Sequence, residues 1–219
     1  ANVLSLSPDE VAIEAGEQSV TWRELQQASN EVIALLEAHG VAASAPVGWA
    51  ARNRPTAVVT FVALILSGRM VVPLRPSYAA ANFIEDIETQ RLQAVLGDHD
   101  DWSADGVIAA AQEAGSVGIE VVGPPFSVRV VPGLEQLGQG PHRDVPPGLV
   151  LERLTSGTTG TPKRIPVSRD ILMPSLRSGE QNTGQANAQL ALKHSPALLF
   201  KPFSHAGGLF GLLMALYQA

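Results

Sequence analysis

The sequence contains no cysteine, and this single absence excludes several kinds of site. The chain cannot form a disulfide, bind a metal ion through thiolates or use cysteine as a nucleophile. Lysine is also scarce, because only Lys163, Lys193 and Lys201 are present. Together with a formal net charge of −6, this scarcity argues against a nucleic-acid-binding surface, which needs clustered lysine and arginine.

Charged residues of both signs are few. They make up 16% of the 219 residues, whereas about 25% is typical of soluble proteins. Hydrophobic residues make up 45%, a share that excludes an intrinsically disordered chain. A chain of this length can bury a sizeable core, either as one large domain or as two small ones.

The sequence also lacks a hydrophobic run long enough to cross a membrane. Its two longest runs, residues 57–66 and 206–217, fall short of the roughly 18 to 20 residues that a spanning helix requires. Near the N-terminus, Asp9 and Glu10 occupy positions where a secretory signal would carry basic residues. We therefore expect a soluble, cytoplasmic protein without a transmembrane segment.

In the first part of the chain, helical and strand-like patterns alternate. Capping-box spacing from Thr21 to Glu24 and a stop at Gly40 predict a helix between them. Asn53 is expected to cap the next helix, which is apolar on nearly every face and ends at Gly68. Further helices are predicted over residues 80–89 and 104–114, and strands over residues 11–13, 19–20, 47–50, 70–74, 94–96, 119–122 and 128–131. This alternation predicts an α/β fold with a mostly parallel sheet layered with helices.

Two features indicate how the chain is divided. Glycine and proline are frequent between residues 132 and 148, which predicts a connection between an α/β subdomain over residues 1–147 and the start of a second α/β region over residues 148–219. Residues 208–217 are apolar on every face, and no helix-ending residue follows them. Either this helix docks into the domain's own core, or the chain is a fragment that lacks the covering residues. We favour the fragment, in which the exposed helix is expected to favour self-association.

One segment carries a strong chemical signal. A strand expected over residues 149–151 leads into a hydroxyl- and glycine-rich run that closes with Pro162, Lys163 and Arg164. The run consists of Thr155, Ser156, Gly157, Thr158, Thr159, Gly160 and Thr161. Backbone amides, hydroxyl groups and a lysine are groups that bind a polyphosphate. The pattern is not a Walker A loop, because proline rather than glycine precedes the lysine. The alternative interpretation is a polar surface linker.

The segment from Thr155 to Lys163 resembles the phosphate loop of the adenylate-forming, or AMP-binding, superfamily. That loop reads Thr-Ser-Gly-Thr-Thr-Gly, any residue, Pro-Lys-Gly. Arg164 departs from the last glycine of the pattern, and we expect it to place a second cation beside the phosphates. The resemblance implies that Thr155 to Thr161, together with Lys163, bind ATP.

Three further segments, residues 20–25, 63–76 and 202–209, resemble segments of the same family in the same order. The last contains His205, which lies between an apolar strand expected over residues 197–200 and a glycine-flanked helix start. By itself, a lone histidine in such a place is more often a helix cap or a surface residue than a functional group. The resemblance implies instead that His205 lies near the carboxylate substrate and the α-phosphate.

The resemblance implies ATP-dependent activation of a carboxylic acid, and we expect a fatty acid. The acid would become an acyl-adenylate and then, with coenzyme A, an acyl-CoA, while Mg²⁺ would neutralise the phosphates. His205 and Lys163 are the implied catalytic residues, and residues 208–216 are expected to line the acyl pocket. No metal-ligating residues are predicted in the chain.

Several motifs of the family are missing from this sequence. The adenine-side and ribose-binding motifs and the C-terminal domain with its catalytic lysine are not found. We therefore expect the N-terminal part of a longer acyl-CoA synthetase-like ligase, folded as part of that enzyme's large N-terminal domain and inactive alone. The alternatives are a non-catalytic ATP-binding domain, an adenylation domain that delivers an amino or aryl acid to a carrier protein, and an ordinary doubly wound domain with a fortuitous loop.

Overall fold

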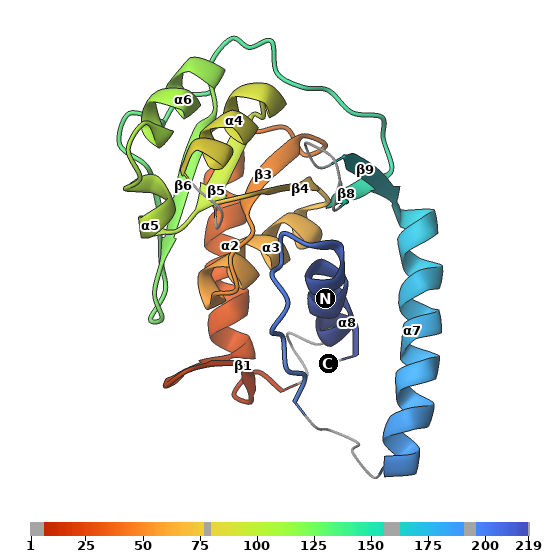
Figure 1. The fold of residues 1–219 in the computed structure, drawn as a ribbon. Helices are drawn as coiled ribbons and strands as arrows, with labels where there is room; N and C mark the ends of the chain where they lie inside the picture. The colour runs from red at the N-terminus through yellow and green to blue at the C-terminus, as the bar shows by residue number, and fades with distance from the viewer. Residues whose placement is uncertain (1–6, 77–79, 156–162, 191–195, 219) are drawn as a thin grey trace.

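The computed structural model describes residues 7–76, 80–155, 163–190 and 196–218 (Figure 1). A two-stranded sheet comes first, formed by β1 (Val11–Ala15) and β2 (Gln18–Thr21). The main sheet contains β3 (Pro46–Ala50), β4 (Met70–Leu74), β5 (Ala94–Gly97), β6 (Val117–Val122), β7 (Ser127–Val130), β8 (Leu149–Leu154) and β9 (Arg164–Ser168). The helices are α2 (Trp22–Ala38), α3 (Pro55–Ser67), α4 (Ala80–Gln90), α5 (His99–Trp102), α6 (Val107–Ala114), α7 (Arg169–Leu190) and α8 (Ala206–Gln218).

Within the described part of the chain, the main sheet has seven strands in the order β7-β6-β5-β3-β4-β8-β9. The neighbours from β6 to β8 pair in parallel, whereas β7 and β9 pair antiparallel at the two edges. Parallel neighbours need a crossover connection, and α3 and α4 lie in the connections that follow β3 and β4. The predicted α/β fold with a mostly parallel sheet is confirmed.

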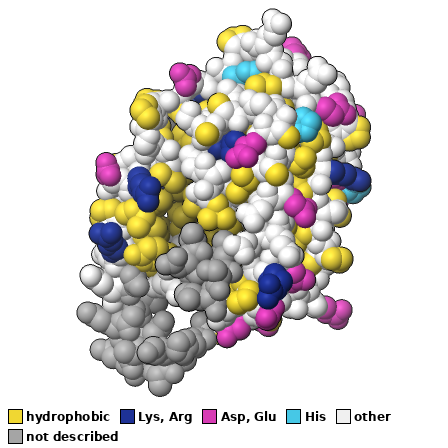
Figure 2. Space-filling view, turned by 180° about the vertical axis from the view of Figure 1, so that it is seen from behind, with side chains coloured by type: hydrophobic (Ala, Val, Ile, Leu, Met, Phe, Trp, Pro, Cys, Tyr) yellow, Lys and Arg dark blue, Asp and Glu magenta, His cyan; other side chains and the backbone are white. Residues whose placement is uncertain are grey.

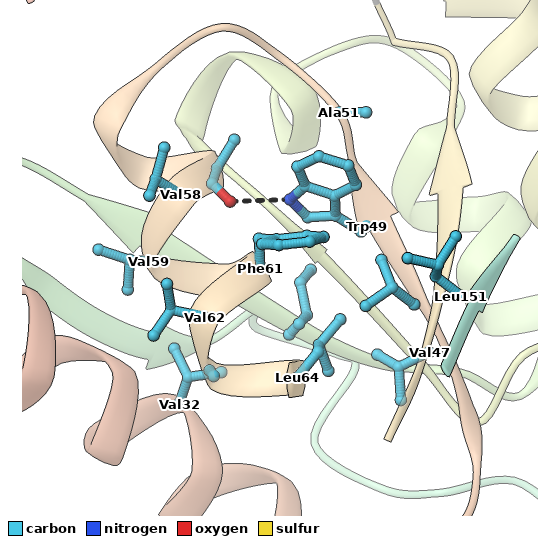
Figure 3. Packing of buried hydrophobic residues seen from close by; sticks show 14 of the residues in the cluster. Val32, Val47, Trp49, Ala51, Val58, Val59, Phe61, Val62, Leu64 and Leu151 are labelled. Atoms are coloured by element: carbon cyan, nitrogen blue, oxygen red, sulfur yellow. Dashed lines mark hydrogen bonds between the residues drawn. The ribbon is translucent and has the colours of Figure 1, made fainter. Parts of the chain in front are cut away.

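The core lies on both faces of this sheet. Successive residues of a strand face opposite sides, so Trp49 of β3 packs beneath α2 and α3 while Ala50 packs with residues of α4 and α6. Figure 3 shows Trp49 against Phe61, with ring centroids 5.0 Å apart. The indole N–H of Trp49 donates to the Ala57 carbonyl at 2.8 Å, which satisfies a polar group that burial would otherwise leave unpaired.

Local signals set the ends of α2 and α3 largely as predicted. The Thr21 hydroxyl accepts from the Glu24 backbone N–H, and the Glu24 carboxylate accepts from the Thr21 backbone N–H, so the capping box is confirmed. Gly68 ends α3 at a φ of 74°, a conformation that glycine adopts without strain. The expectation that Asn53 caps α3 is wrong: the N-cap is Arg54, and no side chain caps this helix.

The region after β5 differs from the helix expected over residues 104–114. A short helix, α5, begins directly after β5, because Asp98 and Asp101 form a capping box with each other's backbone N–H groups. The next helix, α6, begins only at Val107, because Gly106 takes a φ of 82° and interrupts the helical path.

In the last part of the chain, one predicted strand does not form, and one helix was not predicted. The apolar strand expected over residues 197–200 does not form; Leu198 and Phe200 are exposed there, and the segment pairs with no strand among the described residues. The sequence pattern also did not indicate α7, since Pro174 and Gly179 lie inside it. In Figure 1, α7 stands at the side of the molecule, and it contacts α8 and β9.

Both sides of the predicted division after residue 147 contribute strands to the main sheet, since β8 pairs with β4. The division into two regions stays a prediction. The terminal apolar helix forms as α8, and it buries Leu209, Leu212 and Leu213 while Phe210 stays 39% exposed. In the described ranges, no helix combines the length and the apolar character that crossing a membrane would require.

Truncation of the buried ring beside Trp49 tests this packing. We expect Phe61→Ala to lower the free energy of unfolding by about 3–5 kcal/mol, because it leaves a cavity in the core. The matched control is Phe210→Ala, whose ring is 39% exposed, and it should cost about 1 kcal/mol or less. Urea unfolding followed by tryptophan fluorescence measures both, and equal losses for the two variants would contradict the packing.

Candidate functional site

Several strand ends meet at one edge of the main sheet. The strands β3, β4, β5 and β8 run in the same direction, and Arg52, Arg75, Asp98 and Thr155 lie just after their carboxyl ends. The chain passes from β3 to β4 on one side and then returns to β5 on the other side of β3. In open α/β sheets, ligands bind at carboxyl ends where the connections diverge in this way. This edge is the candidate site.

The predicted phosphate loop starts and ends at this edge. The Thr155 backbone N–H donates to the Lys163 carbonyl at 3.0 Å, and the Thr155 hydroxyl lies 3.3 Å from the same oxygen. These contacts extend the β8–β9 hairpin and hold the two stems of the loop together. Lys163 is exposed. The rest of the predicted site, Ser156, Gly157, Thr158, Thr159, Gly160 and Thr161, lies outside the described residues, so its contacts with phosphate stay a prediction.

Arg164, at the stem of the predicted loop, is ion-paired. Its side chain is 15% exposed and donates to Asp86 Oδ1 at 2.7 Å and to the Pro73 carbonyl at 2.8 Å. The nitrogen that donates to Pro73, Nη1, also lies 3.5 Å from Glu152 Oε2. Arg164 is therefore ion-paired with two carboxylates, which Arg75 and Arg143 also contact. The expected place of Arg164 beside the phosphates stays a prediction.

These contacts belong to a larger cluster, here called the Arg164 cluster, of Arg75, Asp86, Arg143, Glu152 and Arg164. Its two carboxylates are almost fully buried, with side-chain exposures of 4% for Asp86 and 1% for Glu152. Arg75 donates to both oxygens of Asp86 at 2.9 Å, and Arg143 pairs with Glu152. The hydrogen bond to Asp86 raises the pKa of Arg75. The cluster ties the stem of the loop to α4 and β8.

His205 lies directly before α8, as its sequence context predicted. Its backbone N–H donates to the Pro202 carbonyl at 3.0 Å, and its carbonyl accepts from Leu209 at 2.9 Å. The His205 side chain is exposed. The neighbouring Ser204 is buried, and its hydroxyl has no hydrogen-bond partner among the described residues.

Asn53 joins the segment before His205 to the turn after β3. Its Nδ2 donates to the carbonyls of Leu199 at 3.4 Å and Lys201 at 2.9 Å, and its Oδ1 accepts from the Phe203 backbone N–H at 2.9 Å. The sequence did not indicate that Asn53 binds this segment, because no local pattern links an asparagine to residues about 150 positions away. Asn53 brings the His205 segment to the edge where the predicted phosphate loop begins.

Two ion pairs hold the turn that carries Asn53. Arg52 Nε lies 2.5 Å from Asp101 Oδ1, and Arg54 Nη1 lies 2.8 Å from Asp98 Oδ2. Burial and the nearby Asp98 carboxylate raise the pKa of Asp101 to about 6, although its hydrogen bonds to Asp98 N–H and Arg52 oppose the shift. The Asp101 side chain is 1% exposed, so its charge depends on these contacts rather than on water.

A polar cleft of about 350 Å³ lies beside this turn, lined in part by Asn53, Arg54, Asp98, His99 and Asp100. Arg54 pairs with both Asp98 and Asp100, which lie 2.8 and 2.7 Å from its Nη1, so one positive charge faces two carboxylates. The charged side chains in this lining are therefore ion-paired with each other, with one carboxylate in excess.

The described residues form no metal centre, and the face shown in Figure 2 carries no basic patch. Across the described ranges, no group of three or more histidine, aspartate or glutamate side chains gathers where it could hold a metal ion. On the face shown in Figure 2, lysine and arginine side chains lie scattered among acidic ones. That face lacks the clustered cations that contacts with a nucleic-acid backbone need.

Comparison with known sequences links the chain to one family. The family model described as "AMP-binding enzyme" matches residues 2–219. Phosphinothricin tripeptide synthetase PhsC of Streptomyces viridochromogenes is 28% identical over 197 residues, which cover 87% of this chain and 17% of that protein. Bacitracin synthase 3 of Bacillus licheniformis is 25% identical over 207 residues, which cover 90% of this chain and 3% of that protein. The chain thus spans less than a fifth of these relatives.

Comparison with solved structures shows the same fold. ATP-bound MatB from Rhodopseudomonas palustris matches with a TM-score of 0.66 and 23% identity, covering 96% of this chain and 41% of MatB. The O-succinylbenzoate coenzyme A synthetase MenE from Bacillus subtilis, in complex with AMP, matches with a TM-score of 0.62 and 20% identity, covering 99% of this chain and 52% of MenE. The chain spans about two fifths to one half of these structures.

Removing the charge of Arg164 tests the Arg164 cluster. We expect Arg164→Met to lower the free energy of unfolding by about 1–3 kcal/mol, because two buried carboxylates each lose one partner and keep another. Arg153→Met is the matched control, since Arg153 is exposed on β8, and it should change stability by about 0.5 kcal/mol or less. Urea unfolding measures both, and an unchanged Arg164→Met would show that the cluster contributes no stability.

The raised pKa of Asp101 predicts a pH-dependent stability. The folded chain binds this proton more tightly than the unfolded chain, so the contribution is complete below about pH 4 and is lost as the pH rises through about 6. Two pKa units correspond to about 3 kcal/mol. From about pH 4 to pH 7, the free energy of unfolding should fall by up to this amount relative to Asp101→Asn, measured by urea unfolding at each pH. A pH-independent difference would contradict the shift.

Proposed function

This chain belongs to the AMP-binding enzyme family, and on that premise we propose that the protein it forms part of activates a carboxylic acid with ATP. The proposed product is an acyl-adenylate, which then passes its acyl group to a thiol. One observation carries the proposal: the loop stems of Thr155 and Lys163 and the His205 segment reach the same edge of the parallel sheet. The carboxylate oxygen must reach the α-phosphorus of ATP, so the segments that bind the two substrates have to lie close together.

In the proposed first step, a carboxylate oxygen attacks the α-phosphorus of ATP. The bond between that phosphorus and the bridging oxygen to the β-phosphate breaks, and pyrophosphate leaves with the electron pair. Negative charge gathers on the phosphates, so positioning and electrostatic stabilisation provide most of the catalysis. We assign the β- and γ-phosphates to Thr155, Lys163 and the segment between them, and the orientation of the carboxylate to His205.

Mg²⁺ is proposed as the cation that accompanies ATP, and coenzyme A as the thiol substrate. Mg²⁺ is commonly held by phosphate oxygens with only one or two carboxylates from the protein. When bound, it would neutralise the phosphate charge. Coenzyme A would supply the thiol that attacks the adenylate carbonyl and releases AMP.

The acyl substrate is proposed to be a fatty acid, which gives acyl-CoA synthetase activity. Of residues 208–216, which we expected to line the acyl pocket, Leu209, Leu212 and Leu213 are buried, and Phe210 is 39% exposed. A second candidate is an adenylation domain that transfers an amino or aryl acid to a carrier protein. The matches to PhsC and bacitracin synthase 3 favour this candidate, because both cover at least 87% of the chain.

Pyrophosphate exchange in the whole natural polypeptide tests the first step. With a panel of fatty, aryl and amino acids, we expect acid-dependent exchange of labelled pyrophosphate into ATP. Lys163→Ala should raise the KM for ATP by about 10-fold or more, and His205→Ala should lower kcat/KM for the acid by about 100-fold. Arg153→Ala, at an exposed position, is the matched control.

The outcomes separate the candidates. Exchange with fatty acids and release of a CoA thioester support the acyl-CoA synthetase. Exchange with amino or aryl acids and no CoA thioester support the carrier-dependent adenylation domain. ATP binding without exchange for any acid would support a non-catalytic domain, and equal ATP affinity for Lys163→Ala and the unmodified protein would contradict the assigned phosphate loop.

A further inference from the structure

We propose that Asn53 is a positioning residue, which fixes residues 199–203 against the carboxyl end of β3 and thereby sets the place of His205. The inference rests on the proposed function, because it assigns the residue that holds His205 for the reaction. It goes beyond that function, since neither the phosphate loop nor the histidine motif includes Asn53.

Both ends of the Asn53 amide are used. The Nδ2 group, with two N–H donors, reaches two carbonyls, those of Leu199 at 3.4 Å and Lys201 at 2.9 Å. The Oδ1 atom accepts from the Phe203 N–H at 2.9 Å. An aspartate could accept from Phe203 but would face the two carbonyl oxygens with a negative charge. The arrangement therefore requires an amide.

The segment over residues 199–203 depends on such a partner. It forms no strand in the described structure, so neighbouring strands do not satisfy its backbone groups. The side chain of Asn53 supplies hydrogen bonds to the backbone groups of this segment that a neighbouring strand would otherwise supply. The ring of Phe203 also stacks on Trp49 of β3, with centroids 6.1 Å apart and an interplanar angle of 18°.

The other side of the segment lies against the start of α8. A Cβ atom at Gly208 would lie 2.1 Å from the Pro202 carbonyl oxygen and 2.6 Å from that of Lys201, so only glycine permits this approach. Because α8 lies so close, the segment is confined between that helix and the turn after β3. A loss of the Asn53 contacts would free it on one side.

Asn53 is itself held in place by its neighbours in the chain. Arg52 pairs with Asp101 and Arg54 pairs with Asp98, so ion pairs to the region after β5 anchor the residues on both sides of Asn53. Paired charges of this kind give the turn a defined geometry. Asn53 can therefore act as a fixed support for the His205 segment.

The link from Asn53 to His205 is short. Phe203, which donates to Asn53, lies two residues before His205, and Pro202 accepts from the His205 N–H at 3.0 Å. A shift of residues 199–203 would therefore move the imidazole relative to the loop that follows β8. Displacements of about 1 Å at a reacting group can reduce a rate by about 100-fold.

A double-mutant cycle in the whole natural polypeptide tests this inference. The variants are Asn53→Ala, Asn53→Asp, His205→Ala and the double variant Asn53→Ala/His205→Ala, with Asn30→Ala on the exposed face of α2 as the matched control. Pyrophosphate exchange gives kcat and KM for the acid and for ATP. Hydrogen exchange of the peptide that contains the Phe203 amide reports on the segment independently of activity.

We expect Asn53→Ala and Asn53→Asp to lower kcat/KM for the acid by roughly 10- to 100-fold and to change the KM for ATP less than about 3-fold. In the His205→Ala background, the same Asn53→Ala change should cost less than about 3-fold, because its effect passes through the histidine. Asn53→Ala should speed exchange at Phe203, because it removes the acceptor of that amide. Asn53→Asp keeps an acceptor there and loses the two contacts to carbonyls, so its effect is read from kcat/KM. Asn30→Ala should match the unmodified protein in every measurement.

Additive losses in the double variant, or unchanged exchange at Phe203, would overturn the positioning role. Equal rises in the KM for ATP and for the acid would also overturn it, because they would indicate a general loss of structure. The proposed function fails separately: in that case the unmodified protein shows no acid-dependent exchange, or His205→Ala is fully active. Hydrogen exchange at Phe203 would then still show whether Asn53 holds residues 199–203 in place.

Discussion

Parallel pairing of β3 with β4 on one side and with β5 on the other brings the segments of the proposed site to one edge of the sheet. Parallel strands end at the same edge, so the turns after β3 and β5 become neighbours, and the loop after β8 lies along the same edge with β4 between β3 and β8. The pairing requires close contact at its centre. A Cβ at Gly48 of β3 would lie 2.8 Å from Leu74 Cδ1 and 3.1 Å from Leu92 Cδ1, so this strand accepts no larger residue without movement of its neighbours.

Ion pairs then hold these segments in place at the edge of the sheet. Arginine does this work in two places: Arg52 and Arg54 pair with carboxylates that follow β5, and the Arg164 cluster ties the stem of the loop to α4. The planar guanidinium suits both, because it donates several hydrogen bonds in fixed directions. Lys163, in contrast, is exposed at the end of the loop, where a mobile cation can reach a phosphate. The arginines are thus fixed in ion pairs, whereas Lys163 is exposed for the phosphate role that we propose.

Much of the fold was predictable because its signals are local. Thr21 and Glu24 lie within one helical turn of each other, and Gly68 ends α3 through its own backbone conformation. The alternation of helix and strand, which is also read from neighbouring residues, indicated the parallel sheet. Predictions failed where distant contacts decide. The apolar run over residues 197–200 has the composition of a strand, but the Leu199 carbonyl accepts from the side chain of Asn53 instead of from a neighbouring strand. Pro174 and Gly179 argue against a helix, and yet they lie within α7, which packs against α8 and β9.

The sequence by itself determined which residues we propose for the site: a run of threonine, serine and glycine that ends in Pro162 and Lys163, and a histidine before a glycine-flanked helix. Tertiary structure alone decided which of the other polar residues serve that site. Asn53 resembles a helix cap in sequence and binds the His205 segment in the fold, and Arg164 resembles a phosphate ligand and forms an ion pair with Asp86. The physical reason is the range of the interactions. Backbone conformation and capping depend on neighbours within a few residues, whereas a side-chain hydrogen bond or ion pair depends on whichever strand the fold places beside it.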